Sequence, residues 1–161
     1  PRPAPAPVVE VRAAPAPAPV VEARAAPVPA APAPAPQPAY DCAAALAQIN
    51  GGAPIHFAFG RTYLGPENLQ VVRDYANLLK DQRCTSTRAE IAGHADYYGS
   101  RVFNQWLSEA RAQRVVDELV AEGVDASRLT VKGYSESDPA VNQRTYDARV
   151  QNRRVVVTVV K

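Results

Sequence analysis

The sequence predicts one domain of mixed α-helices and β-strands (α+β) behind a Pro/Ala-rich tether. Thirteen of the 16 prolines but no aromatic residue fall in residues 1–38, whereas residues 39–161 hold every Tyr, Phe and Trp and both Cys. The hydrophobic pattern of residues 39–161 changes several times between the two-residue alternation of strands and the three-to-four-residue spacing of helices. We therefore expect a flexible, disordered linker over residues 1–38 and a globular domain over residues 39–161.

The tether carries a duplication of twelve residues, PAPAPVVEVRAA at 3–14 and PAPAPVVEARAA at 15–26. Alternating Pro and Ala favour polyproline II at roughly 3.1 Å per residue, which gives the tether a reach on the order of 100 Å. We interpret it as a semi-rigid spacer. The alternative is a ligand for a proline-recognition domain, although P-x-x-P spacing beside a basic residue recurs only loosely.

The first half of the domain predicts a strand, a helix and a second strand. Residues Ile55–Phe59 (IHFAF) alternate as a strand does. Pro66 opens a helix in the first-turn position, where its missing N–H costs nothing. One face of this helix is apolar: Leu69, Val72, Ala76 and Leu79. The short apolar run Ala89–Ala92 predicts the next strand.

The stretch from Ser100 to Glu122 places apolar residues on two nearly opposite faces of a helix. The first set is Phe103, Trp106, Leu107 and Ala110, and the second is Val115, Val116, Leu119 and Val120. We expect one helix to end at Leu107 and a second to begin with Ser108 as its N-cap. The alternative is one continuous helix that different neighbours bury in its two halves.

Two strands are expected after Gly123, which is a helix stop. Leu129–Tyr134 (LTVKGY) is the first. The second, Val155–Val160 (VVVTVV), has no alternation, which indicates a strand that is central in its sheet.

Composition and spacing exclude several functional classes. The domain holds 15 basic and 14 acidic residues, and so even a balance argues against electrostatic binding of nucleic acid by the whole domain surface. No apolar run is long enough for a transmembrane helix. His56, His94, Cys42 and Cys84 lack the short spacings of zinc sites. There is no G-x-S-x-G elbow and no Gly-rich phosphate loop. We expect no metal, no cofactor and no nucleic-acid partner.

The stretch GHADYYGSRVFNQWLSEAR, residues 93–111, holds the candidate ligand-binding groups. Asp96 lies in a loop after a strand, and Asn104, Ser108 and Arg111 form one polar line if the segment is helical. A carboxylate and a guanidinium that face one cleft suit a zwitterionic ligand, because Asp96 accepts from an ammonium while Arg111 forks onto a carboxylate. The alternative is that Asp96 and Arg111 simply pair with each other.

Four motifs in order resemble the OmpA-like peptidoglycan-binding domain over about residues 42–161: GHAD, FNQWLSEARAQRV, GYSESDP and NRRV. The resemblance implies a two-layer βαβαββ sandwich with a mixed four-stranded sheet. It also implies that Asp96 and Arg111 hold the diaminopimelate residue of the peptidoglycan stem peptide, with Asn104 and Arg153 as further ligand-binding positions. Two departures stand out, since the family's usual Thr is Ala95 here and a usual Gly is Ser135.

The resemblance further implies a non-catalytic module of the periplasm that anchors the outer membrane to the cell wall. The tether resembles the Pro-Ala hinge behind an outer-membrane barrel, so we expect a barrel or another membrane anchor upstream of Pro1. On this basis Asp96→Ala and Arg111→Ala each abolish wall binding with little loss of stability.

The placement of Cys42 and Cys84, and similar Cys positions in some relatives, predict a disulfide between them. A bridge over such a loop contributes roughly 4 kcal/mol in the chain-entropy model, and it favours an oxidising compartment.

Two other classes of function stay open at this point. The first is an envelope scaffold or stator-type docking module whose main contacts are between proteins, with an oligomer possible. The second is an enzyme with His94 and Asp96 as an acid–base pair, for which no nucleophile or second base falls at a matching position.

Overall fold

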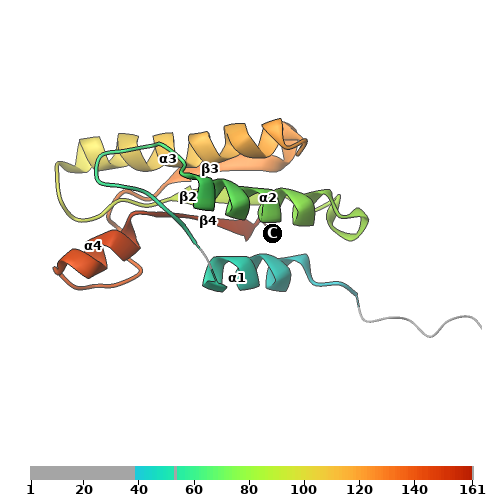
Figure 1. Ribbon diagram of the computed structural model, residues 1–161, viewed down its shortest axis with the longest axis horizontal. Coiled ribbons are helices and arrows are strands. Elements are labelled where there is room, and N and C mark those ends of the chain that lie inside the picture. The colour runs from blue at the N-terminus through green and yellow to red at the C-terminus, as the bar shows by residue number, and fades with distance from the viewer. Residues whose placement is uncertain (1–38, 53, 161) are drawn as a thin grey trace, which may run out of the picture. The chain divides into compact units, whose positions relative to one another are not determined.

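The computed structural model describes residues 39–52 and 54–160, so the expected linker over residues 1–38 lies outside the described part of the chain. The described elements are α1 (Cys42–Gly52), β1 (Ile55–His56), α2 (Pro66–Lys80), β2 (Ala89–Gly93), α3 (Arg101–Ala121), β3 (Leu129–Gly133), α4 (Tyr146–Asn152) and β4 (Arg154–Val159). Short 3₁₀ turns at Gln82–Cys84 and Ala126–Arg128 precede β2 and β3. The expected βαβαββ order is confirmed, with α1 and α4 added to it (Figure 1).

The strands form one mixed sheet in the order β1-β4-β2-β3. Strand β2 runs parallel to β3 and antiparallel to β4, which in turn pairs antiparallel with β1. The apolar run at the C-terminus is therefore a central strand, as its lack of alternation predicts. Central Ile91 lies between Val131 of β3 and Val157 of β4.

Helices α1, α2 and α3 cover one face of the sheet and enclose the core. The core side chains come from all three helices and from the sheet: Leu46, Val72, Tyr75, Leu79, Val115, Leu119, Ile55, Ile91, Val155 and Val157. The other face of the sheet carries polar side chains such as Glu90, Thr130 and Lys132. This gives the two layers of an α+β sandwich.

Local sequence explains where the helices begin and end. Pro66 occupies the first turn of α2 behind an extended Gly65, and the Ser100 hydroxyl caps α3 by accepting from the Phe103 N–H at 3.2 Å. Gly123, with φ +95°, follows the end of α3 in a left-handed conformation that favours glycine.

The expected helix break at Ser108 is wrong, because α3 runs unbroken from Arg101 to Ala121. Val115, Val116 and Leu119 of the second apolar stripe face the core, while Phe103 and Trp106 of the first stripe stay exposed and Leu107 is buried. The change of face therefore reflects a change of surroundings along one helix.

The expected strand at Ile55–Phe59 is shorter than predicted, since β1 ends at His56. The Phe57 N–H still donates to the Arg153 carbonyl at 2.9 Å, but the carbonyls of Phe57 and Ala58 accept from arginine side chains and not from a strand. Two arginines thus replace the sheet as partners of this segment.

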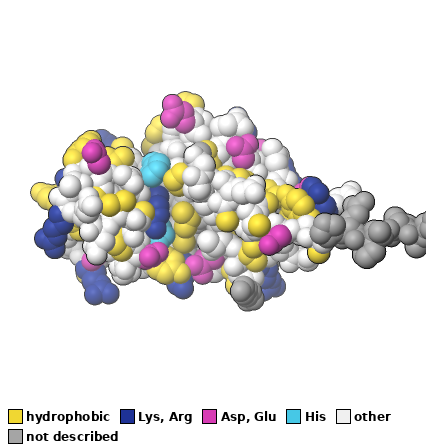
Figure 2. Space-filling view, turned by 90° about the horizontal axis from the view of Figure 1, so that it is seen from below, with side chains coloured by type: hydrophobic (Ala, Val, Ile, Leu, Met, Phe, Trp, Pro, Cys, Tyr) yellow, Lys and Arg dark blue, Asp and Glu magenta, His cyan; other side chains and the backbone are white. Residues whose placement is uncertain are grey.

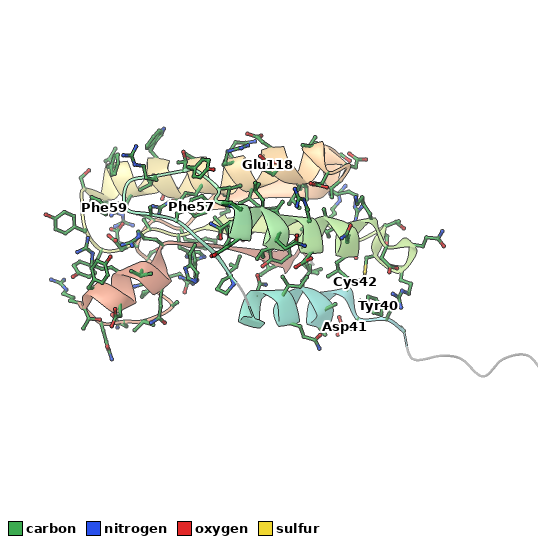
Figure 3. The ribbon with its side chains drawn as sticks, in the orientation of Figure 1. Tyr40, Asp41, Cys42, Phe57, Phe59 and Glu118 are labelled. Carbon is green, nitrogen blue, oxygen red and sulfur yellow. A yellow bond between two sulfur atoms is a disulfide. The ribbon has the colours of Figure 1, made fainter. Side chains whose placement is uncertain are left out.

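The predicted disulfide is confirmed, with a Cα–Cα distance of 5.9 Å between Cys42 and Cys84. It joins the start of α1, where Figure 3 labels Cys42, to the turn after α2. No helix in residues 39–52 or 54–160 has the length and hydropathy needed to cross a membrane.

Candidate functional site

One small pocket brings together all four residues that the sequence predicts as ligand-binding: Asp96, Asn104, Arg111 and Arg153. They come from the loop after β2, from the first half of α3 and from the junction of α4 and β4. The loop after β1 closes the pocket from the other side, at the left of Figure 1. In the absence of ligand the pocket has room for about one water molecule.

Asp96 is buried, with 3% of its surface exposed, and both carboxylate oxygens are engaged. Oδ1 accepts from the Tyr98 N–H at 2.8 Å. Oδ2 accepts from Arg153 Nη1 at 3.0 Å and from Arg149 Nε at 3.5 Å. The Asn104 amide donates to the Asp96 carbonyl at 3.1 Å, so Asn104 fixes the loop that carries the carboxylate.

Arg111 is fully buried and donates to three backbone carbonyls. These belong to Ala58 at 3.1 Å, Arg61 at 3.0 Å and His94 at 3.1 Å. Burial is the main cause that lowers the pKa of Arg111, the nearby Arg153 charge adds to it and Asp96 opposes it, so that the pKa lies at about 10. The guanidinium is still charged at neutral pH, and it ties the loop after β1 to the end of β2.

Asp96 and Arg111 do not pair with each other. Both lie in the described part of the chain, and neither a hydrogen bond nor an ion pair joins them. The carboxylate has Arg153 and Arg149 as its partners, and Arg111 has carbonyls. The structure therefore does not contain the direct ion pair that was the alternative to a ligand site.

Close packing of α3 on the sheet determines the depth of the pocket. A Cβ at Gly93 would lie 1.9 Å from the Ser108 carbonyl oxygen, and a Cβ at Gly133 would lie 2.7 Å from the Ser108 hydroxyl. These two glycines face each other in β2 and β3. Because both lack a side chain, the helix approaches the strands closely at Ser108, and this brings Arg111 within reach of the His94 carbonyl.

Ser108 belongs to this packing and does not line the pocket. Its hydroxyl donates to the Gln105 carbonyl at 2.9 Å and accepts from the Ser135 N–H at 3.1 Å. Of the polar line Asn104–Ser108–Arg111, the first and last residues therefore face the pocket and the middle one holds the loop after β3.

The two departures from the family pattern, Ala95 and Ser135, contact each other. The Ala95 N–H donates to the Ser135 carbonyl at 2.8 Å, and both residues are buried. Ser135 has φ +53°, in the left-handed region that glycine adopts without strain. The family's usual glycine at this position thus has a conformational reason.

Sequence reasoning missed Arg149 and two aromatic residues at the rim of the pocket. The Arg149 guanidinium lies 4.9 Å from the Tyr98 ring centroid and 5.6 Å from that of Phe59, and the two rings meet edge to face at 5.7 Å. Figure 3 labels Phe59 on the loop after β1. The sequence did contain a signal for the short helix that carries Arg149. Thr145 is an N-cap, and Arg149 stands four residues before Arg153.

His94 faces away from this pocket, although it stands two residues from Asp96. Its ring is 1% exposed and stacks on Tyr134 at 5.2 Å, and burial lowers its pKa to about 4. Its Nδ1 lies 3.9 Å from an Asp138 carboxylate oxygen. The geometry does not bring His94 and Asp96 together as an acid–base pair.

Arg153 separates the pocket from a second, wider groove. This groove, of about 580 Å³, lies between α4 and the β1–α2 region, with His56, Glu67, Tyr146 and Arg153 among its lining residues. Figure 2 shows the surface hollowed beside α4, with acidic and basic side chains interspersed around it. Within residues 39–52 and 54–160, no three His, Cys, Asp or Glu side chains gather as metal ligands.

Comparison with known proteins relates the chain to proteins of the bacterial envelope. The profile of the OmpA family matches residues 56–153. Outer membrane porin F of Pseudomonas fluorescens is 38% identical over 105 residues, which cover 65% of this chain and 32% of that protein. Peptidoglycan-binding protein ArfA of Mycobacterium tuberculosis is 34% identical over 126 residues, 78% of this chain and 38% of that protein. The chain thus spans about a third of the length of these relatives.

A solved structure confirms the fold. The peptidoglycan-associated lipoprotein from Burkholderia pseudomallei superimposes with a TM-score of 0.64 at 20% identity, over 70% of this chain and 93% of that chain. The match covers nearly the whole of that chain, so the described elements share its fold.

Proposed function

Because the chain belongs to the OmpA family, we propose that residues 39–161 bind peptidoglycan non-covalently through the diaminopimelate residue of its stem peptide. The observation that carries the proposal is the shared pocket: a buried carboxylate and a buried guanidinium from separate elements lie at one site without pairing. A ligand that bears an ammonium and a carboxylate on one carbon matches this arrangement.

Asp96 supplies the anionic half of the site. Its shorter contact, to Arg153 at 3.0 Å, holds the carboxylate in place, whereas the Arg149 contact is long at 3.5 Å. An incoming ammonium replaces Arg149 at the carboxylate; the Arg149 side chain is 23% exposed and keeps its contacts with the Tyr98 and Phe59 rings. The loss of one long ion pair is small beside the charge-assisted bond that forms.

Arg111 supplies the cationic half. A guanidinium has five N–H donors, and three of them already donate to the carbonyls of Ala58, Arg61 and His94. The remaining donors on Nη1 and Nη2 take the ligand carboxylate. Because the carbonyls already fix the guanidinium, little side-chain entropy is lost on binding.

The proposed module binds without cleaving its ligand. The Ser108 hydroxyl is engaged in packing and His94 is buried away from the pocket, so neither provides a nucleophile or a base beside Asp96. We further propose a periplasmic location at the outer membrane, where the domain ties that membrane to the wall. The relatives' names and the Cys42–Cys84 disulfide, which an oxidising compartment favours, support this location.

The test is calorimetric titration of the domain with a diaminopimelate-containing stem peptide, alongside co-sedimentation with purified sacculi. Asp96→Asn keeps the shape of the side chain and removes its charge, so we expect the affinity for the peptide to fall about 100-fold. Asp74→Asn, on the exposed side of α2, is the matched control and leaves the affinity unchanged.

A second ligand tests the carboxylate-binding half of the site separately from the ammonium-binding half. A stem peptide with lysine in place of diaminopimelate keeps the ammonium and lacks the adjacent carboxylate, so it binds about 10- to 100-fold more weakly to the wild type. Equal affinity for the two peptides, or unchanged binding by Asp96→Asn, contradicts the proposed function.

A further inference from the structure

The first half of α3 exposes an unusual amount of apolar surface close to the pocket. Val102 is 82% exposed, Trp106 58% and Phe103 45%. Single exposed apolar side chains are normal, but a contiguous cluster on a folded domain marks a place where something binds. The Phe103 and Trp106 rings lie together, with centroids 5.8 Å apart.

Trp106 also forms a wall of a groove between α3 and the exposed edge of β3. The groove has a volume of about 520 Å³, within the range of roughly 300–1,000 Å³ that small-molecule sites occupy. On the α3 side its lining residues are mostly polar and include Gln105, Glu109 and Gln113, and on the β3 side it is lined by Val131, Lys132 and Gly133. The Gln105 amide donates to Glu109 Oε1 at 2.6 Å and to the Gly133 carbonyl at 3.0 Å, so this wall is ordered before any ligand arrives.

An indole beside side-chain amides and a carboxylate fits a pyranose ring. Such a ring has an apolar face of C–H groups, which packs on an aromatic face, and an edge of hydroxyl and N-acetyl groups, which pair with amides and charged side chains. A lipid surface would instead favour an apolar patch with a basic rim, and Glu109 lies in the groove wall.

The groove lies next to the pocket, with the rings of Phe103 and Trp106 between them. Phe103 lines the pocket, its ring lies against Trp106, and Trp106 lines the groove. In peptidoglycan the stem peptide is covalently joined to the sugars, so a diaminopimelate residue held in the pocket keeps sugar rings close to this part of the surface. We propose that Phe103, Trp106 and the groove beside β3 bind the N-acetylated glycan strand of the polymer, an inference that rests on the proposed function.

The experiment compares two soluble ligands that share one stem peptide. The first is the free diaminopimelate-containing peptide, and the second is the same peptide joined to its N-acetylated disaccharide. We expect the wild type to bind the disaccharide form about 5- to 10-fold more tightly, the gain typical of one aromatic contact. Trp106 is the single Trp of the chain, so its fluorescence reports the sugar directly: the disaccharide form, and not the peptide, shields it from a soluble quencher.

Substitutions at Trp106 then test whether its ring causes the tighter binding of the disaccharide form. Trp106→Ala loses the gain and keeps the wild-type affinity for the free peptide, whereas Trp106→Phe keeps most of the gain. Tyr63→Ala removes an even more exposed aromatic that lines neither the pocket nor the groove, and it leaves both affinities unchanged. The Trp106 side chain is exposed, so its removal leaves the fold intact.

Each other outcome overturns the inference. A gain that persists in Trp106→Ala, or no gain in the wild type, removes the glycan site while peptide binding leaves the proposed function standing. A change of oligomeric state in Trp106→Ala, measured by sedimentation, identifies the cluster as a contact between copies. If the wild type binds neither ligand, the proposed function fails and this inference fails with it.

Discussion

Replacing Arg111 with alanine removes the side chain that ties three backbone segments together. Its guanidinium is fully buried and donates to the carbonyls of Ala58, Arg61 and His94. The sequence alone suggested a ligand anchor whose removal has little effect on stability. The buried position predicts a large loss of stability as well.

The magnitude follows from the surroundings of each carbonyl. The bond to His94 is buried, so the abandoned carbonyl stays unsatisfied, at a cost of about 1–3 kcal/mol. The bonds to Ala58 and Arg61 are part-buried, so water replaces the donor and each loss is about 0.5–1.5 kcal/mol. We expect Arg111→Ala to lower the free energy of unfolding by about 3–5 kcal/mol, near the middle of the range that these three costs span together.

The assay is urea unfolding followed by circular dichroism, with thermal unfolding as a second measurement. For a domain of this size the same loss lowers the Tm by roughly 10–20 °C. Arg114→Ala on the same helix is the control, because Arg114 is partly exposed and pairs with Glu118 one turn away, so its removal changes stability by about 0.5 kcal/mol or less. Arg111→Lys keeps the charge but not the planar fork, and we expect an intermediate loss.

Hydrogen exchange gives an independent readout of the same variant. Without the guanidinium, the amides of residues 57–61 exchange faster while those of β2 and β4 follow global stability. A loss below about 1 kcal/mol in Arg111→Ala would show that the three carbonyls do not depend on this side chain. The reasoning that links Arg111 to the loop after β1 would then be refuted.

Three further predictions concern packing, strain and pH. Gly93→Ala places a methyl 1.9 Å from the Ser108 carbonyl oxygen, so α3 must move and stability falls by about 3 kcal/mol in urea unfolding, with near-normal stability as the contrary result. Ser135→Gly relieves a left-handed serine and raises stability by about 1 kcal/mol, whereas a decrease would show that the hydroxyl contributes more than the strain costs. The folded pKa of His94, about 4, lies below its ordinary value of 6.5, so protonation favours unfolding. Its contribution is fully present above pH 6.5 and is lost as the pH falls through about 4. The drop in stability from pH 7 to pH 4 should therefore be about 3 kcal/mol larger in the wild type than in His94→Gln, and equal drops would contradict the burial argument.

Much of the fold follows from local patterns that the sequence displays openly. The position of Pro66, the stop at Gly123 and the apolar run at Val155–Val160 each depend on near neighbours in the chain, and each predicts its element correctly. The continuous α3 was missed because periodicity assumes that an apolar face is a buried face. Trp106 breaks that assumption, since its face points to solvent.

The sequence predicts which residues line the candidate site, but it does not predict which side chains bond to one another there. The motifs place Asp96 and Arg111, and the structure brings both to one pocket. Their partners come from distant segments: Arg153 and Arg149 lie more than 50 residues from Asp96. The helix that carries Arg149 is seven residues long, too short for a helical period to stand out.

The disulfide between Cys42 and Cys84 has a mechanical consequence. A pull on the backbone at Asp41 meets this covalent bond at once, and the whole segment between the two cysteines forms a closed loop that cannot be unravelled from its end. Tension passes across the sulfur atoms into β2, which β3 and β4 flank on both sides, and β2 leads to Asp96. Extension then requires many ladder bonds to slide together, so a load at Asp41 reaches Asp96 through a covalent bond and a central strand of the sheet.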